Sequence, residues 1–400
     1  MTLLTIAQII TSSLRLDAPP PPLAGDIEWP RLVHHADGHG LTPLLYDIWR
    51  QAGLLGALPL GIRDRMAQAY MDNAQRNLNT RRDLLEAHQI LTEADTPHLV
   101  LKGWTLVERL YSDPAHRVLY DHDFLVPRER AEVGHRALQA AGFRPLPAKD
   151  EWIEKHLRPV WRNDGYGWDG YLFDPNYPRP VELHVHLWEQ GWRGLQVRQL
   201  PDLWSGTQIC SIAGTPMQTL SDENTLVHLA MHFAGHLIEG DGRLNQLLDL
   251  TRFVTKQSTA LDWEHILAQA RHAKVSRFVY ASLFLAHQIF NAPLPPASVW
   301  QRLVAAAPAA FRSWLAESGV SDVLTADYRR PHQGKDYHLT FLAANSMRER
   351  LGIVRFAALP PIEQLMVKYN VRRRWLGPLF YPRYVAERVG QYSRGLLGRS

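Results

Sequence analysis

The sequence contains a single cysteine, Cys210, among 400 residues. One thiol excludes an internal disulfide bond and any metal site built from several cysteines. No apolar run approaches the roughly 20 residues that a membrane-spanning helix needs, and residues 1–14 lack the basic start of a signal peptide. We therefore expect a cytoplasmic protein without a transmembrane segment, long enough to hold two or three domains.

Three carboxylates on two expected strands are the most informative feature that is present. Asp121 and Asp123 lie in one strand, and Glu182 lies in a second strand further along the chain. Side chains at i and i+2 of a strand point to the same face, so the two aspartates project together, as do Glu182, His184 and His186. Converging carboxylates repel one another unless a hard cation neutralises them. The pattern therefore predicts a Mg²⁺ pair of the kind that supports in-line attack on a phosphate.

A Lys-Gly turn precedes the first acidic strand. The pattern indicates a buried strand over residues 97–103 that ends at Lys102 and Gly103, followed by helical spacing over residues 104–111. Glycine at such a turn lets the backbone approach a ligand closely, and a helix start offers free N–H groups to an anion. We predict a phosphate-binding turn, to which Lys102 adds a positive charge. Arg117 is a second candidate phosphate contact.

In this order the motifs resemble those of the uncharacterised nucleotidyltransferase family within the polymerase-β-like superfamily. The resemblance is most specific over residues 97–188. The segments that carry it are Leu101-Lys102-Gly103, Arg117 with Asp121-His122-Asp123, Glu182-Leu183-His184, the helix from Leu229 to His236, and the tail after Leu365. One position departs from the superfamily pattern, because Trp104 follows Gly103 where a serine often touches the triphosphate.

The resemblance implies an enzyme that moves a nucleotidyl group from an NTP donor to an acceptor. It implies Mg²⁺ or Mn²⁺ as the metal, with Asp121, Asp123 and Glu182 as catalytic residues and metal ligands. The nucleotide-binding residues that it implies are Lys102, Gly103, Arg117 and His184. Acceptors in this superfamily include RNA, proteins, peptides and small hydroxylated compounds, so the acceptor is open. The alternative is a catalytically degenerate member that serves as a binding or assembly protein, and Trp104 favours this alternative.

The order of elements predicts an α+β protein, with a small mixed β-sheet core embedded in N- and C-terminal helical regions. We expect an N-terminal helical region over residues 1–94, an α/β core over 95–213, a helical domain over 214–330 and a C-terminal helical segment over 331–400. Helices are expected over residues 1–17, 27–36, 43–51, 61–93, 127–141, 262–273, 275–291, 298–317 and 340–352. Residues 168–173 are expected to form an antiparallel strand that pairs with residues 181–187.

A histidine-rich helix is expected after a capping sequence that begins at Ser221. It carries His228, His232 and His236 one turn apart, on one face. Imidazoles in this arrangement can share a zinc ion, which would make the protein a metallohydrolase. We favour the other interpretation, in which the helix packs on the catalytic core and its histidines are hydrogen-bonded to the core or line the nucleotide pocket. Asp249 is expected to pair with one of them.

The end of the chain is basic and aromatic. Lys368 is followed by seven arginines and only one acidic residue, Glu387, whereas the whole chain has a net charge of +4. This concentration of charge predicts a localised anionic partner, which is RNA, an anionic membrane surface or an acidic face of the protein itself. We also expect residues 368–400 to pack as helix against the core. The expected apolar contacts are Leu376, Leu379, Phe380, Val385 and Val389.

Overall fold

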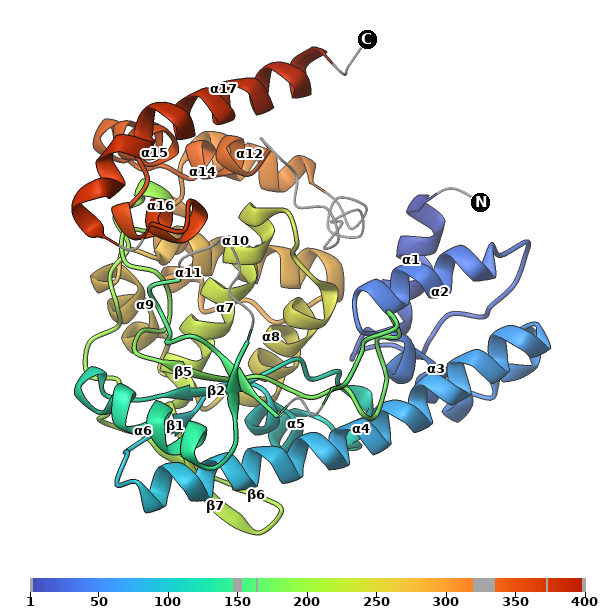
Figure 1. The fold of residues 1–400 in the computed structure, drawn as a ribbon. Helices are drawn as coiled ribbons and strands as arrows, with labels where there is room; N and C mark the ends of the chain where they lie inside the picture. Colours follow the sequence, from blue (N-terminus) through green and yellow to red (C-terminus); the bar gives the residue numbers. More distant parts are fainter. Residues whose placement is uncertain (1–2, 147–152, 163–164, 319–334, 372, 398–400) are drawn as a thin grey trace.

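A five-stranded mixed sheet lies among helices in the computed structural model, which describes residues 3–146, 153–162, 165–318, 335–371 and 373–397 (Figure 1). The strands are ordered β1-β2-β5-β4-β3 across the sheet. β2 and β5 run parallel, and the other neighbouring strands of this sheet are antiparallel. The expected α+β class with a small mixed sheet is therefore confirmed. The strands are β1 (Leu99–Val100), β2 (His122–Leu125), β3 (Arg144–Pro145), β4 (Val160–Trp161) and β5 (Val181–His184).

The expected strand over residues 168–173 is wrong. β5 pairs instead with β2 on one side and with β4 on the other, while residues 165–173 have no strand structure. Gly165 and Gly170 have φ angles of +88° and +97°, in a region that a β-strand does not use. The aromatic residues of the segment suggested a strand, but its glycines bend the backbone out of that conformation.

A second, two-stranded sheet was not expected from the sequence. It is a hairpin of β6 (Gln208–Ile212) and β7 (Thr215–Thr219). Ala213 and Gly214 form its turn with positive φ angles, as two-residue hairpin turns require. The expected core boundary at residue 213 therefore falls inside one hairpin. Thr219 Oγ1 donates a hydrogen bond to the carbonyl of Val100, 2.8 Å away, which ties the hairpin to β1.

One face of the main sheet is covered by α4 (Leu60–Glu93) and α6 (Arg128–Ala140), which lie below it in Figure 1. Buried polar side chains of α4 hold the segment that leads into β2. Asn73 and Asn77 donate to the carbonyls of Ala115 and Arg117, at 2.7 and 2.8 Å, and Arg76 donates to Leu119. The polar face of α4 thus fixes the strand that carries the aspartates.

The opposite face of the sheet lies toward a set of helices that form most of the remaining core. They begin with α7 (Asp222–Glu239), whose N-terminus is capped as expected, since Ser221 Oγ accepts a hydrogen bond from the Asn224 N–H at 3.2 Å. The others in this region are α8 (Leu244–Gln257), α9 (Trp263–His272), α10 (Ser276–Phe290), α11 (Ala297–Ala306) and α12 (Ala309–Glu317). The N-terminal helices are α1 (Leu3–Ser13), α2 (Trp29–Gly38) and α3 (Thr42–Gln51). The shorter helix α5 (Trp104–Leu110) follows β1.

Two helices that the sequence predicted as continuous are each divided. The helix expected over 298–317 is α11 followed by α12, because Pro308 lacks an N–H and holds Ala307 in an extended conformation. The helix expected over 340–352 is the end of α14 (Lys335–Leu342) and the start of α15 (Met347–Ala358). Ser346 caps α15 by accepting from the Glu349 N–H at 3.2 Å, which marks a new helix start.

The C-terminal segment is helical, as expected, and consists of α16 (Ile362–Lys368), η4 (Arg374–Phe380) and α17 (Tyr381–Leu397). Its expected apolar contacts are wrong in part. Leu379 and Val389 are exposed by 70% and 62%, whereas Tyr384 of α17 is buried. No helix among the described residues is long and apolar enough to cross a membrane.

Candidate active site

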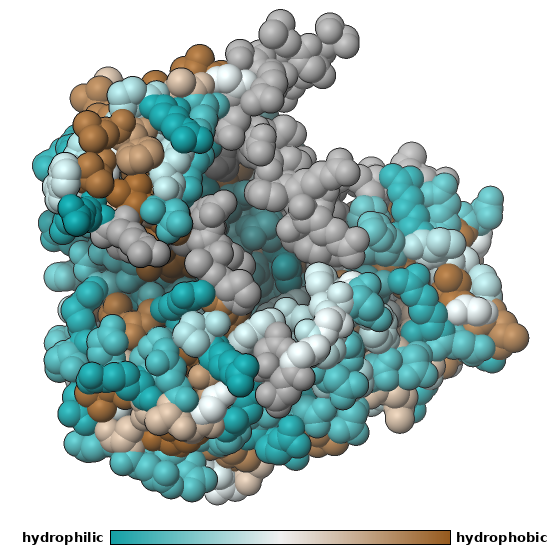
Figure 2. Space-filling model, in the orientation of Figure 1, coloured by the Kyte–Doolittle hydropathy of each residue, from teal (hydrophilic) through white to brown (hydrophobic). Residues whose placement is uncertain are grey.

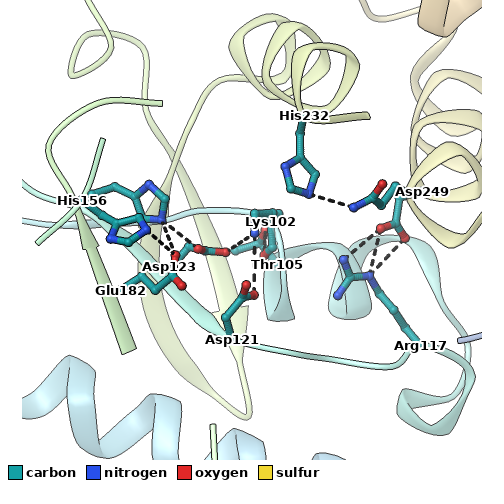
Figure 3. Close-up of polar contacts among 11 residues, drawn as sticks. Lys102, Thr105, Arg117, Asp121, Asp123, His156, Glu182, His232 and Asp249 are labelled. Atoms are coloured by element: carbon teal, nitrogen blue, oxygen red, sulfur yellow. Dashed lines mark hydrogen bonds and ion pairs between the residues drawn. The ribbon is translucent and has the colours of Figure 1, made fainter. Parts of the chain in front are cut away.

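The parallel pairing of β2 and β5 brings the two acidic strands together. In this register Asp123 lies opposite Glu182, and Leu125 lies opposite His184. The side chain of Asp123 is 1% exposed, that of Glu182 is 18% exposed and that of Asp121 is 31% exposed. Figure 3 shows the three carboxylates gathered on one side of the sheet, below α7. The alternation read from the sequence therefore places the carboxylates on a shared face.

His184 links two of these carboxylates. Its Nε2 lies 2.9 Å from Asp123 Oδ1 and 3.3 Å from Glu182 Oε2. Burial lowers the pKa of His184, but the hydrogen bonds to Asp123 and Glu182 outweigh burial and raise it overall. One ligand atom from each of these three residues falls within 4.8 Å of the others, as a metal site requires. The sequence predicted Asp121 as a metal ligand together with Asp123 and Glu182. In this group of three, His184 stands in place of Asp121. His186 lies beyond β5 and contacts Arg128 at 2.7 Å.

Lys102 lies between the two aspartates. Its Nζ is 2.5 Å from Asp123 Oδ2 and 3.6 Å from Asp121 Oδ1. Burial lowers the pKa of Lys102, but the charges of Asp121 and Asp123 outweigh it and raise the pKa, so the lysine stays charged. Burial raises the pKa of Asp123, but Lys102 and the hydrogen bond with His184 outweigh it and hold the pKa of that carboxyl below its ordinary value. Asp121 has the opposite shift, because burial and repulsion from Asp123 raise its pKa to about 6.

The Lys-Gly turn has positive φ angles, a backbone conformation that glycine adopts without steric cost. Lys102 and Gly103 have φ angles of +24° and +52°, and Thr105 Oγ1 donates to the Lys102 carbonyl at 2.8 Å. Trp104 is buried, with the Arg81 guanidinium 5.8 Å from its ring centre. The side chain that replaces the superfamily's serine therefore packs in the core.

Arg117 makes a buried ion pair. Its guanidinium donates to both carboxylate oxygens of Asp249 on α8, at 2.9 to 3.1 Å, and Asp249 also accepts from Tyr111 Oη at 2.7 Å. Figure 3 places this pair on the far side of Lys102 from Asp123 and Glu182. The expected pairing of Asp249 with a histidine is wrong, because its carboxylate is bonded to Arg117 and Tyr111 instead. The pair joins the segment before β2 to α8.

The histidines of α7 lie above the carboxylates without forming a three-histidine metal cluster among the residues described. His228 is buried and His232 is partly buried, and burial lowers the pKa of both, so both are neutral at pH 7. His232 Nε2 lies 3.3 Å from Gln246 Nε2, and His236 Nδ1 lies 3.0 Å from Asp241 Oδ1. These partners favour the interpretation of a packed helix at the roof of the site.

Two residues near the site were missed by the sequence reasoning. His156 Nε2 lies 3.5 Å from Glu182 Oε2, and its Nδ1 lies 2.7 Å from the carbonyl of Leu157. No pattern in that irregular segment indicated it. Arg179 lies two residues before β5, is 6% exposed, and has no hydrogen bond from its Nε within the described structure. Burial lowers the pKa of Arg179 to about 10. No local pattern indicated it, because strand alternation puts residues three positions apart on opposite faces.

The family model described as "Uncharacterised nucleotidyltransferase" matches residues 25–291, so the chain belongs to that family. No curated protein matches the chain significantly.

Two solved structures are similar to part of the chain. The solution structure of the antibiotic-resistance factor ANT(2'')-Ia has a TM-score of 0.31 and 15% identity, and the match covers 48% of this chain and 91% of that one. An antigenic nucleotidyltransferase-like protein from Paracoccidioides brasiliensis has the same TM-score and identity, with 55% of this chain and 94% of that one covered.

Proposed function

We propose that the protein transfers a nucleoside monophosphate from an NTP to an acceptor hydroxyl by metal-dependent in-line attack. The observation that carries this proposal is the register of β2 and β5, which sets Asp123 against Glu182 with His184 between them. Family membership supports the general reaction, nucleotidyl transfer. The acceptor hydroxyl attacks the α-phosphorus, the bond to pyrophosphate breaks, and the hydroxyl proton passes to a carboxylate.

The residues present fit a divalent cation. Two carboxylates and one imidazole have ligand atoms within 4.8 Å of one another, and carboxylate oxygens are the ligands that Mg²⁺ and Mn²⁺ prefer. Asp123, Glu182 and His184 would hold the ion, and Asp121 would extend the site toward the substrate. A bound cation of this kind polarises the phosphate and neutralises charge on it.

The other charged groups have separate roles. Lys102 would move its ammonium from Asp123 to the triphosphate and neutralise the leaving pyrophosphate. Asp121 would accept the proton of the acceptor hydroxyl, because Asp123 and Glu182 are already engaged by His184 whereas Asp121 contacts Lys102 at 3.6 Å. Arg179, a buried cation beside the site, would be a further contact for phosphate. Arg117 remains a predicted phosphate contact, although its present partner is Asp249.

A catalytically degenerate binding protein is the second candidate function. The observation in its favour is Trp104, whose side chain packs in the core at the position of the superfamily's serine. Such a protein would bind NTP but form no labelled product.

The test is to incubate purified protein with each α-labelled NTP, Mg²⁺ or Mn²⁺, and a cell extract. We expect metal-dependent labelling of one acceptor or class of acceptors. Asp123→Asn should abolish labelling, and Asp95→Asn is the matched control because the Asp95 side chain is 98% exposed. NTP binding without labelling by any extract would favour the degenerate protein, and equal labelling by Asp123→Asn would contradict the proposed site.

A further inference from the structure

The C-terminal helical region exposes apolar side chains in a regular pattern on α15. Met347, Leu351 and Val354 are spaced i, i+4 and i+7, so they lie along one side of the helix, and they are exposed by 65%, 65% and 57%. Ile353 and Glu349 are buried on the other side. The buried side of α15 therefore contacts the core, and the apolar stripe on its other side faces away from the core.

Arginines flank this stripe. By helical geometry, Arg348 and Arg355 lie along one edge of it and Arg350 lies along the other. All three are exposed, and neither Arg348 nor Arg355 has an ion pair within the described part of the chain. An exposed apolar stripe with guanidinium groups along both edges is the pattern of a helix that lies in a membrane interface.

The neighbouring elements extend the same kind of surface. Trp375 and Leu379 of η4 are exposed by 68% and 70%, and Val389 of α17 is exposed by 62%. Arg373 and Arg374 are exposed beside Trp375. Figure 2 shows hydrophobic surface at the upper left, where Figure 1 places α15, and further apolar surface next to α17. Surface apolar groups gathered in this way mark an interaction site more often than isolated ones do.

Charge points to the nature of the partner. Residues 335–400 contain twelve Lys and Arg residues and four Asp and Glu residues, so this region is more positive than the whole chain, whose net charge is +4. RNA-binding surfaces present several aromatic side chains on which bases stack, whereas the large apolar side chains exposed on α15, η4 and α17 are aliphatic apart from Trp375. Aliphatic side chains enter the boundary between headgroups and acyl chains, while the long arginine stems keep their charges at the phosphates.

We propose that α15, η4 and α17 form a docking surface for an anionic phospholipid bilayer, hereafter the C-terminal surface. Since no described helix can span a membrane, the contact is peripheral. It does not depend on the proposed transferase activity. Docking would hold the protein at the bilayer with the carboxylate site on a separate part of the molecule (Figure 1).

The test is co-sedimentation of the full chain with vesicles of phosphatidylcholine alone and with vesicles that also contain phosphatidylglycerol. We expect binding to the anionic vesicles that weakens at high salt, and little binding to the neutral ones. Leu351→Glu should weaken binding by about tenfold or more, because it puts a negative charge in the apolar stripe. Ile209→Glu is the matched control, since Ile209 is equally exposed, at 65%, on the β6–β7 hairpin.

The variants also separate the alternatives. Leu351→Glu should keep the melting temperature of the parent, and if it does not, the milder Val354→Ser replaces it. Equal vesicle binding by the variant and the parent would overturn the proposal. So would a parent protein that does not distinguish anionic from neutral vesicles, or that binds single-stranded RNA but no vesicles.

Discussion

The carboxylate site and the C-terminal surface use charged residues in opposite ways. At the site, Asp123 and His184 are buried, the side chain of Lys102 is only 11% exposed, and each charge has a partner within 3 Å. On the C-terminal surface, Arg348 and Arg355 are exposed beside exposed aliphatic side chains. A buried charge without a partner costs several kcal/mol, so the site must be satisfied internally. An exposed charge carries no such cost and is available to a partner outside the chain.

The first prediction addresses the buried half of this comparison. Asp123→Asn removes one charge at nearly constant volume and should lower nucleotidyl transfer by about a thousandfold, because the metal loses a ligand and Lys102 loses its partner. The rate of acceptor labelling measures the loss. The control variant Asp95→Asn, at an exposed position, should keep the parent rate. If Asp123→Asn binds NTP with the same Mg²⁺-dependent affinity as the parent, the metal site lies elsewhere.

A second prediction separates structure from binding at Arg117. Arg117→Ala leaves Asp249 buried without its ion-pair partner, and this should cost about 3 to 5 kcal/mol in the free energy of unfolding. Denaturant unfolding measures it. Arg302→Ala breaks a pair with Glu264 that is exposed on both sides, so it should cost about 0 to 1 kcal/mol.

The outcome at Arg117 also decides its role. If Arg117→Ala keeps its stability but loses NTP affinity, the guanidinium serves the triphosphate, as the sequence suggested. If the double variant Arg117→Met, Asp249→Leu regains stability and still binds NTP, the pair is structural.

The third prediction concerns Lys102. Lys102→Ala should weaken triphosphate binding by about tenfold to a hundredfold relative to binding of the bare nucleoside, because the lost ammonium contacts phosphate charge. Calorimetric titration with NTP and with nucleoside measures the two affinities. Equal losses for both ligands would remove Lys102 from the phosphate site.

Lys102→Ala should also make stability depend on metal. Without the lysine, Asp121 and Asp123 repel each other, and Mg²⁺ should restore part of the stability that the variant loses in a chelator. The melting temperature with and without Mg²⁺ is the readout. The parent protein is the control, and an identical Mg²⁺ response in both proteins would contradict this role of the lysine.

The smallest effect is expected on the exposed side of the comparison. Leu351→Ser and Trp375→Ser should change the free energy of unfolding by less than about 0.5 kcal/mol, because both side chains are mostly exposed. Tyr384→Ser, on a buried residue of the same region, should cost about 2 kcal/mol or more. Large losses at Leu351 or Trp375 would mean that these side chains serve the fold and not a partner.

Local sequence determined the strands around the Lys-Gly turn and the carboxylates, most helices and the shared face of the acidic residues. Strand alternation placed Asp121 with Asp123 and Glu182 with His184, because the side-chain period of a strand depends on the backbone alone. The capping residue Ser221 and the long run of α4 were equally readable, since a helix start and a helix period are local properties. The Lys-Gly turn belongs to the same category.

Only the tertiary structure decided which distant groups meet. Arg117 and Asp249 are 132 positions apart in the chain, and nothing local distinguishes an arginine that will meet a carboxylate from one that will meet a phosphate. The same holds for the burial of Arg179 and for the exposure of Leu351, because burial depends on which elements pack on a residue and not on the residue itself. Periodicity gives the direction of a side chain from its own backbone, whereas the surface that it faces is supplied by the rest of the fold.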